Sequence, residues 1–133
     1  MSDSYVNPYY NPAPYIPASL SEIYDLLASL VGGAPTFIDE SGVFPERNID
    51  SEFHVLTEGF GKVRKKVGEE RYAALMQLAA QAKALFSEDQ AEDNGKTMQG
   101  IALLYEIEDI IQSVRSKRVK AKEKDEEGDV SGD

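Results

Sequence analysis

Two carboxylates near the C-terminal part of the chain, Glu106 and Asp109, lie three residues apart in a segment whose spacing predicts a helix. Residues at i and i+3 share a helix face, so this pair has the ligand type that Mg²⁺ prefers. Helical metal-dependent nucleotide hydrolases need a second such pair on a facing helix. The candidates, Glu69 and Glu70, are adjacent and diverge by about 100 degrees around a helix. The pattern therefore favours a solvated polar face over a metal centre.

Other catalytic chemistry has less support in the sequence. His54 is the single histidine, and with Glu58 one turn later it gives fewer than the three protein ligands usual for catalytic zinc. There is no cysteine, and no serine lies in a G-x-S-x-G elbow. The glycines of Gly59–Gly61 lack the third glycine of a phosphate-binding pattern. We therefore expect no catalytic residues, no bound metal and no cofactor.

The segment Glu88–Asp109 is the most acidic part of the central chain, with seven acidic residues and Lys96 as its one cation. It combines a polar loop with the exposed face of a helix. If the two lie side by side, they form one negative patch, with an aromatic side chain as its anchor. The residues expected to contact a partner are Asp89, Glu92, Asp93, Tyr105, Glu106, Glu108 and Asp109.

The overall charge agrees with a protein partner. The 133 residues carry a formal net charge of −10, which disfavours nucleic acid, because phosphate binding needs clustered Lys and Arg. Opposite potentials would instead favour a basic protein surface. The sequence has no stretch of about 18 apolar residues, which a membrane span would need. It also lacks the basic start followed by an apolar run that would indicate a secretory signal. We expect a cytoplasmic, one-domain protein that contacts no membrane.

Four segments have apolar residues at helical spacings of three and four. In the strongest, Ile101, Leu104, Ile107, Ile111 and Val114 form one stripe. A wide apolar face must be covered by other elements, so this helix is expected at the centre of the domain. The fold class is therefore all-α, a compact bundle of about four helices. The expected helices are 19–31, 50–67, 69–86 and 97–115, within a domain spanning 19–115.

The remaining segments are expected to be irregular. Residues 1–18 form a Tyr/Pro-rich arm, either disordered or docked on the domain or a neighbour, since proline disfavours both helix and central strand. Residues 116–133 form a charged disordered tail, although the basic run at its start is able to prolong the last helix. The apolar residues of the 34–49 loop are expected to fold back onto the core, with a short hairpin as an open alternative.

The first interpretation of function is a small acidic protein-binding module that masks a basic site on its partner. In composition the chain is similar to small acidic proteins that neutralise bacterial nuclease toxins, although no family motif carries this similarity. One alternative is a structural or assembly subunit that uses the Tyr/Pro arm. A second is a Mg²⁺-dependent all-α nucleotide pyrophosphohydrolase. The sequence leaves the oligomeric state open.

Overall fold

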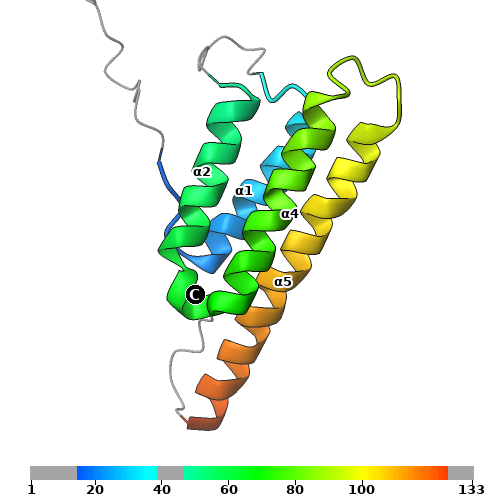
Figure 1. The fold of residues 1–133 in the computed structure, drawn as a ribbon. Helices are drawn as coiled ribbons and strands as arrows, with labels where there is room; N and C mark the ends of the chain where they lie inside the picture. Colours follow the sequence, from blue (N-terminus) through cyan, green and yellow to red (C-terminus); the bar gives the residue numbers. More distant parts are fainter. Residues whose placement is uncertain (1–14, 39–46, 126–133) are drawn as a thin grey trace, which may run out of the picture.

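The computed structural model describes residues 15–38 and 47–125, with side chains as far as residue 118, and all regular structure within these ranges is helical (Figure 1). Four long helices and one single-turn helix make up the fold. Their bounds are α1 Leu20–Gly33, α2 Ile49–Lys62, α3 Arg64–Val67, α4 Glu69–Ser87 and α5 Lys96–Asp125. The prediction of an all-α fold is confirmed for the described residues, and their five helices agree roughly with the expected count of about four.

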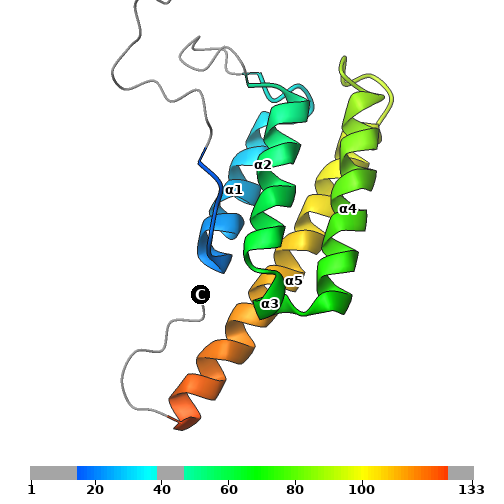
Figure 2. The same ribbon diagram turned by 60° about the vertical axis from the view of Figure 1, so that its left-hand side comes forward.

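The four long helices run alternately up and down and close into a ring (Figure 1, Figure 2). In this ring α1 contacts α2 and α5, and α4 contacts the same two helices. The connections from α2 through α3 to α4 and from α4 to α5 are short, which makes these helices antiparallel neighbours. The contact between α1 and α5 closes the bundle, so α5 has a neighbour on each side and one outer face.

The core consists of the apolar stripes that the sequence predicts. Leu104, Ile107 and Ile111 of α5 are fully buried, and so are Leu20, Ile23 and Leu27 of α1. On α4 the small side chains of Ala79 and Ala82 are buried, which allows helices to approach closely. The isoleucine-rich helix is thus a central, buried element of the bundle.

The loop after α1 contributes one aromatic side chain to this core. Phe37 is 5% exposed, and its ring meets those of Phe53 and Phe86 edge-on, at 5.7 and 5.2 Å between centroids. Such edge-to-face pairs add to the gain from burial alone. The next residue, Ile38, is 59% exposed and does not fold back as expected. The hairpin alternative concerns 39–46 and lies outside the described residues.

The start of α1 has the S-x-x-E sequence of a capping box, from Ser19 to Glu22, but differs from that motif in one of its hydrogen bonds. The backbone N–H of Glu22 donates to Ser19 Oγ at 3.2 Å, as the S-x-x-E pattern predicts. The Glu22 carboxylate, however, accepts from the backbone N–H of Ala18 at 2.8 Å and from the Tyr15 hydroxyl at 2.9 Å. The carboxylate thus fixes the chain that enters the helix, one residue earlier than predicted.

The second predicted helix, 50–67, is broken in the structure. Its start is capped by Asn48, which exchanges hydrogen bonds with Ser51. At the other end Val63, with φ −106° and ψ 12°, interrupts the helix and separates α2 from the single turn of α3. Arg64 then forms a forked ion pair with Glu69, at 2.8 and 2.7 Å, and lies over the Tyr72 ring, joining α3 to α4.

The last helix continues past the predicted end of the domain. It reaches Asp125, so positions 116–125 are helical and the prediction of a disordered tail is wrong for them. Figure 1 and Figure 2 show this part of α5 projecting beyond the ends of the other helices. The basic run Arg115–Lys124 has good helix formers and almost no apolar residues, so it propagates the helix without entering the core. The rest of the tail lies outside the described residues.

Even α5, at 30 residues, lacks the continuous apolar stretch that a helix needs to cross a bilayer, and the other helices of the described part lack it too.

Candidate protein-binding surface

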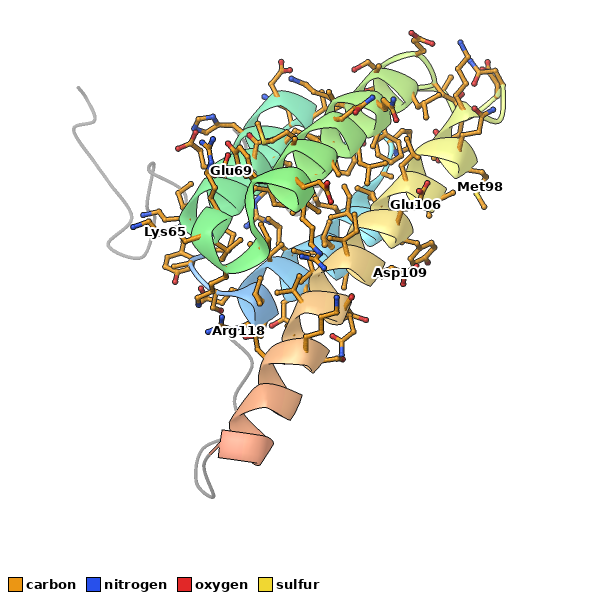
Figure 3. The ribbon with its side chains drawn as sticks, turned by 60° about the horizontal axis from the view of Figure 1, so that its bottom comes forward. Lys65, Glu69, Met98, Glu106, Asp109 and Arg118 are labelled. Carbon is orange, nitrogen blue, oxygen red and sulfur yellow. The ribbon has the colours of Figure 1, made fainter. Side chains whose placement is uncertain are left out.

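Three of the predicted contact residues lie on the outer face of α5. Tyr105 is 50% exposed, and the carboxylates of Glu106 and Asp109 are also exposed. The neighbouring positions Leu104 and Ile107 are fully buried, so the helix separates its apolar and polar sides sharply. Figure 3 shows Glu106 and Asp109 along α5, with Lys65 and Arg118 toward the opposite end of the bundle from Met98.

Neither of these two carboxylates forms an ion pair within the described part of the chain. Among the described residues, ion pairs join Arg64 to Glu69, Lys83 to Asp50 and Lys96 to Glu88, and none includes Glu106 or Asp109. A carboxylate without a partner on its own chain keeps its negative potential available to an approaching molecule. The outer face of α5 is therefore acidic at its middle.

Glu108 occupies the edge of the same helix rather than its outer face. Its side chain is partly buried, and this burial raises the pKa of Glu108, which the charge of Asp109 raises further. A partly buried carboxylate at the edge of the helix is less accessible to a partner than the exposed carboxylate of Glu106. Its predicted role in contacting a partner thus has weaker support.

Asp89 requires a correction, because it is only 2% exposed and cannot contact a partner. Its Oδ1 accepts from the backbone N–H groups of Asp93 at 2.8 Å and Asn94 at 3.2 Å, and its Oδ2 accepts from that of Thr97 at 2.9 Å. Burial raises the pKa of Asp89, but the hydrogen bonds from Thr97, Asp93 and Asn94 together hold it below its usual value. This carboxylate organises the start of α5.

The rest of the α4–α5 loop is also held by its own polar groups. Lys96 Nζ pairs with Glu88 Oε1 at 2.6 Å, and the Asn94 side-chain amide donates to the Glu88 carbonyl at 2.9 Å. The Gln90 amide donates to the carbonyls of both Phe86, at 2.7 Å, and Pro35, at 2.8 Å. The last of these bonds ties the α4–α5 loop to the loop after α1.

The single negative patch that the sequence suggests is in fact two separate acidic areas. Glu92 and Asp93 are exposed in the loop, where Glu92 has a φ of 54°. Glu106 lies ten residues after the first residue of α5, about 15 Å along the axis at 1.5 Å per residue. An uncharged strip of the same helix, Met98 and Ala102, lies between the two areas.

The sequence analysis missed Met98, which is 68% exposed. A signal for it was present, since Met98, Ala102 and Tyr105 recur at spacings of four and three on the face opposite the core stripe. Met98 therefore exposes apolar atoms near the start of α5, and Tyr105 exposes its ring next to Glu106. Large apolar side chains on a solvated helix face are typical of contact surfaces.

The hydrolase alternative needs a facing carboxylate pair, and the structure places none near Glu106 and Asp109. Within residues 15–38 and 47–118, no three His, Asp or Glu side chains gather in a way that could hold a metal ion. His54 is exposed on α2, one turn before Glu58. The geometry of the described side chains gives this alternative no support.

The last residues of the N-terminal arm pack on the bundle. Pro17 is buried, and its Cγ lies 2.8 Å from the position that a Cβ on Gly59 would take. The Tyr15 hydroxyl donates to the Glu22 carboxylate. Tyr5, Tyr9 and Tyr10 of the arm lie outside the described residues.

Comparison of the chain with protein-family models, with curated proteins and with solved structures gave no significant match.

Proposed function

We propose that this chain is a protein-binding module that docks the outer face of α5 onto a basic surface of another protein and covers it. The observation that carries the proposal is the exposure of Tyr105 beside Glu106 and Asp109, two carboxylates without an ion pair among the described residues. The face is straight and helical, so it suits a groove or a shallow basic patch.

Each part of this face has a distinct role. Tyr105 offers a large, rigid ring whose loss of motion on binding is small, which is why aromatic residues dominate binding energy in many interfaces. Glu106 and Asp109 provide the negative potential that speeds encounter with a basic surface and excludes acidic ones. Met98 extends the apolar contact toward the loop, where Glu92 and Asp93 supply a second acidic area.

The test is affinity capture with matched variants. Wild-type protein, E106Q/D109N and the control E58Q/E70Q are immobilised in parallel, and the bound proteins are identified by mass spectrometry. Both variants remove two exposed carboxylates, but only the first changes the α5 face. We expect a basic protein that binds the wild type and the control and is lost from E106Q/D109N, with affinity falling as salt rises. Equal capture by all three proteins, or binding insensitive to salt, contradicts the proposal.

A second candidate function, an assembly subunit that uses the N-terminal arm, is favoured by the packing of Pro17 against Gly59. A buried anchor at the end of the arm gives the preceding tyrosines and prolines a fixed starting point beside α2. Proline lowers the conformational entropy lost when such a segment docks. Deleting residues 1–14 tests this function, because it should reduce the sedimentation mass only if the arm joins copies of the chain.

A further inference from the structure

One exposed row of residues runs along α5 from the middle of the bundle into the projecting part of the helix. Its successive spacings are 4, 3, 4, 4, 3 and 4 residues, which amounts to two 11-residue repeats. Eleven residues complete three turns of an almost undistorted helix, so the row stays on one face. Within the described side chains, every member of the row is exposed. The row is Ala102, Glu106, Asp109, Ser113, Lys117, Lys120 and Lys124.

The charges in this row are ordered by position. Glu106 and Asp109 precede Ser113, and Lys117 and Lys120 follow it, each pair at the same distances from the serine. Four residues separate Ser113 from Asp109 and also from Lys117, about 6 Å each way. Seven residues separate it from Glu106 and also from Lys120. The row is therefore symmetric in spacing and opposite in charge about Ser113.

We propose that the partner of this face is a second copy of the chain, bound through α5 helices that pair antiparallel and cross at Ser113. A two-fold axis there brings each residue to a fixed position on the other copy, as an isologous interface requires. Asp109 then faces Lys117 of the partner subunit, and Glu106 faces Lys120 of the partner subunit. The symmetry repeats both pairs. This inference goes beyond the proposed function, because it gives the same outer face of α5 a second occupant, which would compete with a basic protein for it.

Two features of the monomer favour this arrangement. Within one copy the row places like charges at i and i+3, Glu106 with Asp109 and Lys117 with Lys120, which disfavours the isolated helix. Pairing with the opposite charges of a second copy reverses that repulsion. The small side chain of Ser113 at the crossing point lets the two helices approach closely.

The projecting part of α5 also gains a structural role from this pairing. Beyond Val114 the described side chains are those of residues 115–118, none of them apolar, and the helix then projects past the other helices (Figure 2), so a single copy gives it little tertiary support. In the antiparallel pair it lies along the middle of the other copy's α5, over Tyr105. The Tyr105 ring of one copy and the projecting turns of α5 of the other copy then cover one another.

Charge reversal tests this pairing by sedimentation equilibrium across a wide range of concentration. We expect wild-type chains to form dimers. E106K/D109K makes the four paired positions 106, 109, 117 and 120 all positive, and K117E/K120E makes the same four all negative, so each variant alone should be monomeric. A 1:1 mixture of the two variants should form a heterodimer. The controls E58K/E70K and K62E/K65E change the net charge equally at exposed sites away from the row, and should remain dimers.

Two results overturn the inference: a wild-type chain that stays monomeric, or reversal variants that dimerise as the wild type does. Circular dichroism checks that each variant keeps its helical content. If the wild type is monomeric but captures a basic protein that E106Q/D109N does not capture, this inference is wrong and the proposed function stands. The opposite result is a wild-type dimer that the charge reversals break and restore, together with capture of the same proteins by the wild type and by E106Q/D109N. It would support this inference and end the proposed function.

Discussion

Pro17 and Gly59 are in direct contact, with the proline ring lying where a side chain on residue 59 would have to be. A Cβ there would be 2.8 Å from Pro17 Cγ, whereas a Cβ on Gly61 would meet nothing within 4 Å. The two glycines lie in the same helix, two residues apart, but only the one at position 59 has no space for a Cβ. The close approach of the Pro17 ring explains Gly59, whereas Gly61 is replaceable.

The first prediction uses this pair. Gly59→Ala should destabilise the protein by about 1–2 kcal/mol, because overpacking outweighs the gain in helix propensity. Gly61→Ala should stabilise it by up to about 1 kcal/mol, since alanine favours the helix and meets no neighbour. Urea unfolding measures both. Equal effects of the two substitutions would show that Pro17 does not constrain α2.

The second prediction concerns Gly100, which is buried in α5 against Phe86 of α4. A Cβ on Gly100 would come within 2.6 Å of Phe86 Cε1. Gly100→Ala should therefore cost about 1–3 kcal/mol of the free energy of unfolding, by forcing the ring or the helix to move. The adjacent exposed substitution Gln99→Ala should change it by less than about 0.5 kcal/mol. Chemical denaturation of the two variants makes the comparison, and a harmless Gly100→Ala would contradict the packing.

The third prediction separates the buried and outer faces of α5 at neighbouring positions. Leu104→Ala should lower the free energy of unfolding by about 2–5 kcal/mol, because Leu104 is fully buried and its loss leaves a cavity. Tyr105→Ala should change it by less than about 1 kcal/mol while weakening partner binding, because half of the ring is in solvent. Thermal unfolding and the capture assay read the two effects. A stability loss at Tyr105 comparable to that at Leu104 would remove the ring from the contact surface.

The fourth prediction is a pH dependence that originates at Asp89. The folded state holds the pKa of this carboxylate below its ordinary value of 3.8, so the unfolded chain binds the proton more readily. The stabilisation is fully present above about pH 5 and is lost as pH falls through the folded pKa. Asp89→Asn should lower the melting temperature at pH 7 by roughly 4–8 °C, and should flatten the decline of that temperature below pH 4. Melting curves at a series of pH values test this, and parallel curves for the two proteins would refute it.

The sequence predicts best where burial repeats at a regular spacing. Ile107 and Ile111 are buried as expected, because helical periodicity is a direct consequence of one face meeting the core. The helix break at Val63 was not predicted, since the apolar spacing continues through Val63 to Val67 and the interruption depends on local backbone angles.

The candidate surface was predicted in part for a related reason. An outward position such as Glu106 follows from its place opposite the apolar stripe. Asp89 was misassigned because its burial depends on amide groups four, five and eight residues later, which only a folded loop brings together. Gly100 went unnoticed because its partner, Phe86, lies on another helix. Periodicity shows which way a side chain faces, but not what approaches it from elsewhere in the chain.

The Gln90 side chain, in the loop after α4, donates at once to the carbonyls of Phe86 in α4 and of Pro35, 55 positions earlier. One amide nitrogen therefore joins the loop after α1 to the loop that leads into α5, two segments that lie far apart in the sequence.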